Sequence, residues 1–453
     1  MAVEKSKIIA LSVVIVSFLA FFSGFMFNPL QVLFKNKTLS TQAETLVIGR
    51  LVKSRADGIF SGGGLCGRCF EKPGDSVIYD NQYIAYKENH PCNFFVPYLS
   101  QIGFHAAVYS MIDKISPFSP DTNLWIIRSF KTATLAMVMS LIVLWFFLEF
   151  GLLSAIFVML GIFLTPWFTY LGKDIWFCVW TNFLPFLVAL FVLRREHDLH
   201  RPSEKKIIMF ASLAILINFI FNGYEWVSTT LIMAAIPFFY YWRKDDWPFK
   251  KLFRRIAWLA VGGLVSIAAT FSVLIFQISQ VKGSLSEGVD WLIFSFLKRS
   301  YGSPESMPEV YAKQIDHSLS EVFNRYFNAT AFKIPAFVTG TLHWFPQKIS
   351  FLFVIFIFLV CSFLIHYKGN LLKLMPGKKK LLENLSITTW ISILAPFSWF
   401  LIFKGHAYSH AHINYITWFM PFCLFGLAMV GAIISSAGRS ESLQPSDQKN
   451  DNP

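Results

Sequence analysis

Residues 133–150 read ATLAMVMSLIVLWFFLEF and residues 152–171 read LLSAIFVMLGIFLTPWFTYL, with only Gly151 between them. Glu149 is the one charged residue in the two runs. A helix needs roughly 20 apolar residues to cross a bilayer, because its backbone polar groups must find their partners within the helix itself. The two runs therefore predict two neighbouring membrane spans, and similar runs recur along the chain.

The composition of the whole chain supports this interpretation. Its 453 residues are 55% hydrophobic, 17% aromatic and only 15% charged, which is too apolar for a soluble enzyme of this size. Disorder, collagen-like repeats and a small disulfide scaffold are also excluded, because Phe accounts for 50 residues while Gly, Pro and Cys stay at ordinary or low levels. We therefore expect an all-α polytopic membrane protein.

About ten runs are long enough to span a bilayer. They lie near Ile8–Phe27, Ala133–Phe150, Leu152–Leu171, Ile175–Leu193, Ile207–Phe221, Trp226–Trp242, Ile256–Ile278, Ile349–Tyr367, Ile387–Phe403 and Ile413–Ser435. The first run follows Glu4, Lys5 and Lys7, as a signal peptide would, but it is long and lacks a convincing small-residue cleavage site. We expect it to be retained as a helix.

The basic residues predict the orientation of these helices. If the N-terminus is cytoplasmic and the crossings alternate, three loops with five, six and five Lys or Arg residues face the cytoplasm: Arg194–Lys206, Arg243–Arg255 and Lys368–Lys380. The short outer loops hold only Lys173 and Lys404, so the distribution follows the positive-inside rule. The net charge of +13 is thus explained by membrane orientation, and we expect no nucleic-acid partner. The link at Glu149–Leu152 is predicted inside, although it carries no basic residue.

This topology predicts one membrane-embedded domain over residues 1–435, with two long extracytoplasmic segments. The first covers residues 28–131 and includes interfacial helices, and the second covers residues 280–348. Residues 436–453 are polar and are predicted to be a disordered cytoplasmic tail. The polar residues that are unusual for a membrane protein gather at or near the outer boundary: Asp57, Lys173, Asp174, Tyr224, Glu225, Arg299, Lys404, His406, His410 and His412.

Asp57 is the main candidate for catalysis from sequence. A carboxylate near the membrane interface can take the proton of an acceptor hydroxyl group while it is ionised. The alternative is that Asp57 only turns the chain before Gly58, or pairs with Arg55. Glycines 62–64 lack the flanking strand and helix of a nucleotide-binding loop, so we expect a flexible loop there.

The six cysteines divide into two groups. Cys66 and Cys69 form a single CxxC, and Cys92 lies in the same outer segment. Zinc would require a second pair or suitably spaced histidines, so we expect a structural disulfide among these three residues, with the pairing open. The other cysteines, Cys178, Cys361 and Cys423, lie in apolar runs and are expected to be packing residues.

Two further groups of outer residues are candidates for binding a substrate. Tyr224 and Glu225 follow the fifth run, at a depth where a carboxylate is costly unless it is paired or faces a polar cavity; the alternative is a solvated acid at a helix end. Lys298, Arg299 and Arg325 lie in the second outer segment, where a guanidinium can bind the phosphate of an anionic lipid headgroup or simply be solvated.

The run Lys404-Gly-His406-Ala-Tyr408-Ser-His410-Ala-His412 places His406 and His410 four residues apart, on one face of a helix, and Tyr408 and His412 likewise. Three interpretations stay open for the imidazoles: contact with a polar ligand, ligation of a metal, and interfacial packing. The run lacks the acidic motif of a zinc protease, so we predict no metal and no cofactor.

Several features share one layout: a first helix, an outer segment with an acid, and further polar stretches near the outer boundary. These are Asp57, the stretch Tyr98-Leu-Ser-Gln-Ile-Gly103 that leads through an interfacial helix to Arg128, the turn Lys173-Asp174 before Trp176, and Asn182-Phe-Leu-Pro185. The layout resembles the GT-C superfamily of integral-membrane glycosyltransferases, which includes the protein mannosyltransferases and the lipid A aminoarabinose transferases. Family members more often carry an Asp-Glu pair, whereas Gly58 follows Asp57 here.

The resemblance implies that Asp57 is the base and that a polyprenyl-phosphate-linked sugar is the donor. It also implies that Lys173, Arg299 and the His406 to His412 run contact the departing phosphate. The expected activity is transfer of a sugar to an extracytoplasmic glycan, lipid or protein acceptor in cell-envelope synthesis, at the outer face of a bacterial inner membrane. The alternatives are a polysaccharide polymerase or ligase, a transporter or lipid flippase, and a noncatalytic envelope scaffold.

Overall fold

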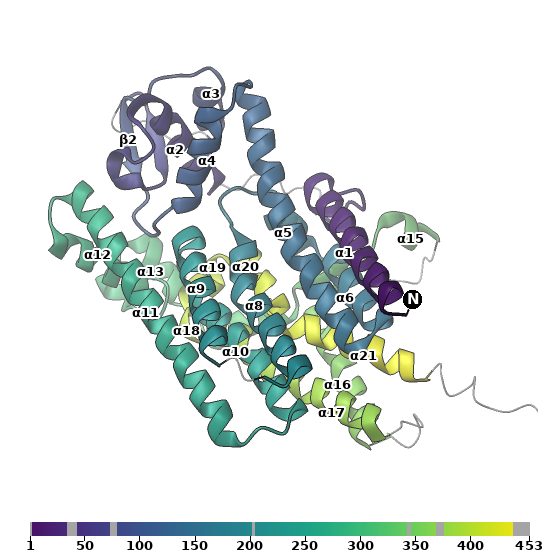
Figure 1. The fold of residues 1–453 in the computed structure, drawn as a ribbon. Helices are drawn as coiled ribbons and strands as arrows, with labels where there is room; N and C mark the ends of the chain where they lie inside the picture. The colour runs from purple at the N-terminus through teal and green to yellow at the C-terminus, as the bar shows by residue number, and fades with distance from the viewer. Residues whose placement is uncertain are drawn as a thin grey trace, which may run out of the picture.

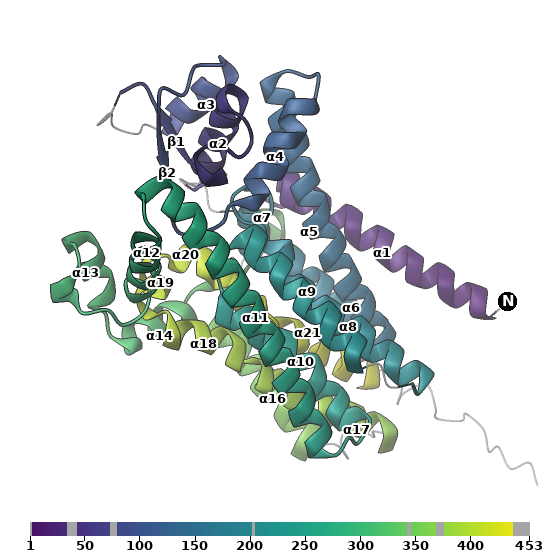
Figure 2. The same ribbon diagram turned by 60° about the vertical axis from the view of Figure 1, so that its left-hand side comes forward.

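The computed structural model describes residues 2–33, 43–72, 79–201, 204–341, 346–367 and 376–437, and most of them are helical. Within these residues, four helices are long and apolar enough to cross a membrane, and the count rises to six if each of two bent helix pairs is one span. The chain is therefore a mostly helical, multi-pass membrane protein. Figures 1 and 2 show a bundle of long helices with a small, separate head at one end.

The bundle contains the longer helices of the chain. They are α1 (Ala2–Phe27), α5 (Pro120–Phe150), α6 (Leu152–Leu164), α7 (Pro166–Gly172), α8 (Val179–Leu199), α9 (Glu204–Asn222), α10 (Val227–Lys244), α11 (Phe249–Lys282), α16 (Phe351–Tyr367), α17 (Pro376–Ser392), α18 (Leu394–Ile402) and α21 (Phe422–Ala437). Between α18 and α21 the chain forms α19 (Lys404–Ser409), α20 (Ala411–Asn414) and a 3-10 turn, η3 (Tyr415–Phe419). Each of the ten predicted runs lies on one or more of these helices.

Two of the predicted runs are bent, and a third becomes helical later than predicted. The run Leu152–Leu171 bends by 62° between α6 and α7, because Thr165 takes the extended conformation that a following proline favours. The last run bends by 43° between η3 and α21. The run predicted to begin at Ile175 becomes helical only at Val179, and residues 173–178 form a turn. Of the predicted tail, Ser436 and Ala437 belong to α21, and the rest lies outside the described residues.

Glu149 holds together the end of the bundle where α5, α8 and α10 meet. Its side chain is 2% exposed, and its carboxylate accepts a hydrogen bond from Arg194 of α8 at 2.6 Å and another from Lys244 of α10. The hydroxyl of Tyr240 donates to the same carboxylate at 2.5 Å. The link after Glu149 therefore lies beside the ends of two helices that lead into predicted basic loops, although the link has no basic residue of its own.

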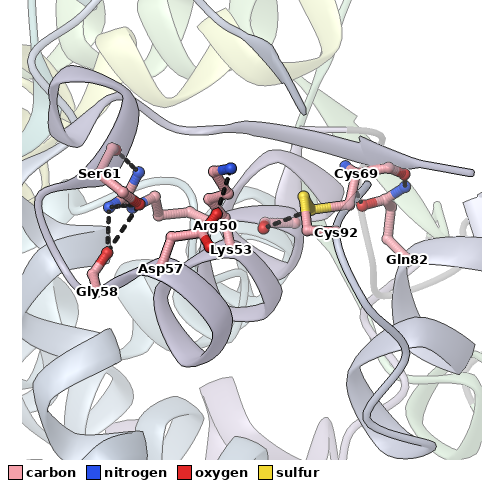
Figure 3. The surroundings of a disulfide bond; sticks show 9 residues. Arg50, Lys53, Asp57, Gly58, Ser61, Cys69, Gln82 and Cys92 are labelled. Carbon is pink, nitrogen blue, oxygen red and sulfur yellow. Dashed lines mark hydrogen bonds and ion pairs between the residues drawn. A yellow bond between two sulfur atoms is a disulfide. The ribbon is translucent and has the colours of Figure 1, made fainter. Parts of the chain in front are cut away.

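The head consists of α2 (Glu44–Asp57), a 3-10 turn η1 (Ser61–Gly64), β1 (Gly67–Phe70), α3 (Tyr79–Lys87), β2 (Phe94–Pro97) and α4 (Phe104–Ile115). Strands β1 and β2 are antiparallel, with Cys69 opposite Phe95. A disulfide joins Cys69 to Cys92, and Gln82 forms hydrogen bonds with the backbone of Cys69 (Figure 3). The expected disulfide is confirmed with this pairing, and Cys66 is a buried free thiol.

Two arginines of α2 give the head its shape. Arg55 binds the carboxylate of Asp113 through two hydrogen bonds of 2.7 and 2.8 Å, which ties α2 to α4. Arg50 is fully buried and donates to the carbonyl oxygens of Gly58, Ile59 and Ser61 in the turn that follows α2 (Figure 3).

The glycine-rich turn after α2 attaches the head to the bundle. The side-chain amide of Gln277 in α11 donates to the carbonyl of Gly63 at 2.8 Å. Gly63 has φ +71°, and a Cβ atom there would lie 3.0 Å from the backbone oxygen of Gln277. The glycines therefore form a packed turn, and the prediction of a flexible loop was wrong because their close approach to α11 is a tertiary contact.

The second outer segment packs against the helices that carry the histidines. It contains α12 (Leu285–Leu297), η2 (Pro304–Ser306), α13 (Glu309–Ile315), α14 (Leu319–Phe327), β3 (Thr330–Lys333), α15 (Ala336–Thr341) and β4 (Lys348–Ser350), with β3 and β4 antiparallel. In α14, Arg325 donates to the carbonyl of Tyr408 at 2.6 Å and Tyr326 donates to that of Ala407 at 2.9 Å. These two hydrogen bonds fix α19 against α14.

We predict that Glu149→Gln lowers the free energy of unfolding by about 3 kcal/mol, because it leaves Arg194 and Lys244 without their shared counter-charge in a buried setting. The measurement is the thermal unfolding midpoint of purified protein in lipid. The control is Glu383→Gln, whose carboxylate is one third exposed and lies 3.9 Å from Lys379. An exposed pair of that kind contributes about 0–1 kcal/mol, so equal midpoints for the two variants would contradict the prediction.

Candidate functional site

Two groups of buried and half-buried polar residues lie near the head, and the turn at residues 173–178 links them. One group, which we name the cavity cluster, comprises Glu225, Arg299, His406 and His410. The other, which we name the Glu44 cluster, comprises Glu44, Arg128, Lys131, Lys173 and Asp174.

A cavity of about 450 Å³ lies beside the cavity cluster. Helices α10, α11, α12 and α18 and the segment after β2 supply its walls, which are mostly apolar: Leu99, Val227, Ile267, Phe271, Leu274, Leu292, Ile293, Phe296, Leu297 and Phe403. Glu225 and Arg299 also line it, and their charges interact. The cavity thus combines an apolar interior with one anionic and one cationic side chain.

Several polar atoms of residues that line this cavity have no hydrogen-bond partner among the described residues. They are Oε2 of Glu225, Nε2 of Gln101, Oγ of Ser295 and Nε1 of Trp399. Gln101 is 4% exposed, and Trp399 is 1% exposed. A buried polar group without a partner costs about 1–3 kcal/mol, so such groups are rare in folded proteins. These four atoms are available to form hydrogen bonds with polar groups of a ligand in the cavity.

The local sequence explains the position of Glu225. Helix α9 ends at Asn222, and Gly223 follows with φ +65°, a conformation that favours glycine. A Cβ atom on Gly223 would lie 2.6 Å from Cβ of Gln101, so this turn packs directly on the segment after β2. Trp226 then takes φ +56°, which is rare for a large side chain, and is fully buried. Such backbone strain persists only where surrounding contacts impose it.

A chain of hydrogen bonds determines which nitrogen of His406 carries the hydrogen. The indole N–H of Trp226 donates to Oδ1 of Asn414 at 2.6 Å, so the amide nitrogen of Asn414 faces Nδ1 of His406 at 3.3 Å. An amide nitrogen only donates, so Nδ1 of His406 is the acceptor and the ring hydrogen is on Nε2. Nε2 lies 3.5 Å from Oε1 of Glu225. His406 therefore presents its N–H to the carboxylate of Glu225.

The charges of the cavity cluster keep Glu225 ionised. Burial alone would raise the pKa of Glu225, but the hydrogen bond from His406 and the positive charge of Arg299 help to lower it to about 2. Burial and the neighbouring His406 lower the pKa of His410 to about 3, so its ring is neutral near pH 7. Arg299 donates to the carbonyl of Ser295 at 2.9 Å and to the hydroxyl of Tyr98 at 3.4 Å.

The Glu44 cluster begins at the first residue of α2. The side chain of Glu44 is 1% exposed, and its carboxylate accepts two hydrogen bonds from Arg128 of α5, with the Nε bond at 3.1 Å. Burial and the charge of Asp174 raise the pKa of Glu44 to about 7 against the opposing effect of Arg128. A carboxyl group with this pKa can gain and lose a proton near neutral pH.

Lys131 connects this cluster to the end of α7. Its ammonium group is buried and donates to the carbonyl oxygens of Leu171 and Gly172, the latter at 2.9 Å. A cation at a helix C-terminus interacts favourably with the helix dipole. Lys173 follows directly, and burial, with the nearby charge of Arg128, lowers its pKa.

The turn at residues 173–178 links the two clusters. Asp174 is fully buried, and its carboxylate accepts the backbone N–H of Trp176 at 2.8 Å. The ring of Trp176 then lies edge-on to Tyr98, which binds Arg299. The next residue, Phe177, stacks on Trp226. A movement of this turn would therefore change the positions of residues in both clusters.

The structure brings most of the predicted site residues into these clusters. Glu225, Arg299, His406 and His410 form the cavity cluster, Tyr224 lines the cavity, and Lys173 and Asp174 belong to the Glu44 cluster. Lys404 and Lys298 lie outside both clusters. The ammonium group of Lys404 lies 5.2 Å from the centre of the Tyr301 ring. Lys298 is enclosed by the rings of Trp291, Phe294 and Tyr311.

Asp57 lies in different surroundings. It is the last residue of α2, its side chain is 46% exposed, and it pairs with Lys53 one turn earlier (Figure 3). Arg55 is instead bound to Asp113, so the alternative pairing of Asp57 with Arg55 was wrong. Among the described residues, Asp57 forms no hydrogen bond or ion pair with a residue of either cluster. Its catalytic role stays a prediction.

The histidine run is less regular than its spacing suggested. His406 and His410 lie together as predicted, with ring centres 4.7 Å apart. Tyr408 and His412 do not share a face, because the helix is interrupted at His410. Tyr408 stacks on His317 beneath Arg325, whereas His412 lies against Tyr170. Among the residues that the structure describes, no group of three or more His, Cys, Asp or Glu side chains is arranged to hold a metal ion.

Sequence reasoning missed Glu44 and Lys131. Glu44 is the first acid after the first predicted span, and Lys131 stands at the edge of a long apolar run. An ionisable residue at such a position is a reason to expect a buried, paired group. Gln101 and Asn414 have no such signal, because their importance comes from contacts between distant parts of the chain.

No protein-family model, curated protein or solved structure matched this chain when it was compared with them. The resemblance to the GT-C superfamily therefore rests on the layout of the sequence.

The raised pKa of Glu44 predicts a specific pH dependence of stability. The folded chain keeps this proton up to about pH 7, whereas the unfolded chain loses it near its ordinary pKa of 4.5. Stability is therefore lost as the pH rises from about 5 to 8, by up to about 3 kcal/mol. We expect the thermal midpoint of the wild type to fall more over this range than that of Glu44→Gln. The exposed Glu287→Gln is the control, and parallel profiles of Glu44→Gln and the wild type would contradict the prediction.

Proposed function

We propose that this protein is a membrane glycosyltransferase that moves a sugar from a polyprenyl-phosphate donor to an extracytoplasmic acceptor in cell-envelope glycan synthesis. The observation that carries the proposal is the cavity of about 450 Å³, with apolar walls and with Glu225 and Arg299 among its lining residues. A lipid-linked sugar has the matching chemistry, because it joins an apolar chain to an anionic phosphate and a polar sugar.

Arg299 is the residue that we assign to the donor phosphate. Its guanidinium lines the cavity, and it is held by Ser295 and Tyr98. A guanidinium can bind two phosphate oxygens at once, and its charge stabilises the negative charge that grows on the departing phosphate. The volume is within the range of small-molecule sites, about 300–1,000 Å³, so the cavity takes the part of the lipid next to the phosphate.

Glu225 and Glu44 suit two different roles in such a reaction. Glu225 is ionised at neutral pH and keeps one oxygen without a partner among the described residues, so it can stabilise positive charge that develops on the sugar. Glu44, with a pKa of about 7, is matched to accept the proton of the acceptor hydroxyl. Two carboxyl groups whose surroundings separate their pKa values are typical of acid–base sites. Asp57 is the alternative base from sequence.

We also propose the ten-crossing, GT-C-like topology, with both long segments and both clusters on the outer face of a bacterial inner membrane. It is supported by the position of Glu149, whose partners Arg194 and Lys244 lie in the predicted cytoplasmic loops Arg194–Lys206 and Arg243–Arg255. It is supported further by the helices found on all ten predicted runs.

The test is transfer of labelled sugar from a panel of polyprenyl-phosphate donors by purified protein in lipid. We expect product from at least one donor, and a loss of about 100-fold or more in Glu225→Gln and in Glu44→Gln. Asp57→Asn is the matched control and should keep most of the activity, because Asp57 is exposed and paired with Lys53. If only Asp57→Asn loses transfer activity, Asp57 is the base. If the protein moves lipid or solute without forming a glycosidic bond, it is a transporter.

A second prediction concerns the donor phosphate. We expect Arg299→Lys to raise the KM for the donor about tenfold, because an ammonium group keeps the charge but cannot form two parallel hydrogen bonds. Arg325→Lys is the control, since the guanidinium of Arg325 lies over the ring of Tyr408, away from the cavity lining. An unchanged KM in Arg299→Lys would remove Arg299 from the donor site.

A further inference from the structure

Helix α12 has three distinct faces. Gly288 and Ser295 are buried, and a Cβ atom on Gly288 would lie 2.8 Å from the backbone oxygen of Ile275, so this face packs on α11. Glu287 and Asp290 form an exposed polar face. The third face is exposed and apolar: Leu285 is 61% exposed, Val289 41%, Ile293 53% and Phe296 53%. Their spacing of four, four and three residues places them in one stripe.

The surroundings of this stripe indicate what covers it. Helix α11 is one of the helices apolar enough to cross a membrane, and its last turns continue the apolar surface with Val273 at 48% and Phe276 at 60% exposure. Figure 1 shows α12 at the upper end of α11, at the edge of the molecule. Lys282 and Lys298 lie near the ring of Trp291, at 5.8 and 5.3 Å from its centre. Tryptophan beside long basic side chains is typical of the boundary between lipid and water.

We propose that α12 lies parallel to the membrane at its extracytoplasmic surface. The stripe of Leu285, Val289, Ile293 and Phe296 is inserted into the outer leaflet of this bilayer, and Glu287 and Asp290 are in water. An amphipathic helix binds a bilayer in this way by burying its apolar face near the level of the headgroups. Five residues of the same helix line the cavity: Leu292, Ile293, Ser295, Phe296 and Leu297. Ile293 and Phe296 thus belong to both the stripe and the cavity wall. A lipid chain reaches the cavity from the outer leaflet along these two residues of α12.

The experiment measures the surroundings of a fluorescent probe on each face of α12. Single cysteines are introduced as Ile293→Cys and Asp290→Cys, labelled with an environment-sensitive dye, and the full chain is placed in phosphatidylcholine nanodiscs; the four native free cysteines are buried. We expect nitroxide lipids labelled near the headgroup to quench the probe at residue 293 at least threefold more than iodide does, and the reverse at residue 290. Val289→Cys is a second variant for the apolar face and keeps the test valid if Ile293→Cys does not fold.

Other outcomes would overturn the proposal. Equal quenching by iodide on both faces would place α12 in water. Protection of the residue 293 probe from both iodide and nitroxide lipids would mean that protein, such as a second copy of the chain, covers the stripe. Stronger quenching by nitroxides at the bilayer centre than near the headgroups would mean that α12 is deeply inserted. None of these results depends on glycosyl transfer, so the proposal and the proposed function can fail separately.

Discussion

A charged group or a backbone amide in hydrocarbon has no water to bind, and the architecture of this protein depends on that constraint. It makes the spanning segments helical and drives ionisable side chains to the two ends of the bundle or into pairs. At one end, Glu149 is enclosed by Arg194, Lys244 and Tyr240. At the other, Glu44 is bound by Arg128, and Lys131 is bound by carbonyl oxygens at the end of α7.

The buried carboxylates differ in how completely they are paired. Both oxygens of Glu149 have partners, as expected of a group that holds helices together. Glu225 has His406 at one oxygen, while the other has no partner among the described residues and belongs to a residue that lines the cavity. Because an unpaired polar atom is costly, this difference separates a structural acid from one suited to a ligand.

The sequence was most informative where a single physical rule acts along the chain. Apolar length predicted where the long helices lie, and the cysteine pattern correctly predicted a disulfide among Cys66, Cys69 and Cys92. Prediction failed where distant contacts decide the structure. The glycines after α2 pack against Gln277 of α11, and Tyr408 stacks on His317, which lies between α13 and α14. Neither partner is near in sequence.

The candidate site also combines features that follow from local sequence with features that depend on distant contacts. Glu225, Arg299 and the histidines were recognisable from sequence because polar side chains at a membrane boundary stand out against apolar surroundings. Three features depend on segments far apart in the chain: Glu225 and Arg299 line one cavity, Trp226 and Asn414 orient His406, and Glu44 is buried with a raised pKa. The sequence by itself thus determined the helices and their polar ends, because hydrophobicity and charge are local properties. Only the tertiary structure decided which polar groups are paired, since pairing depends on packing between helices.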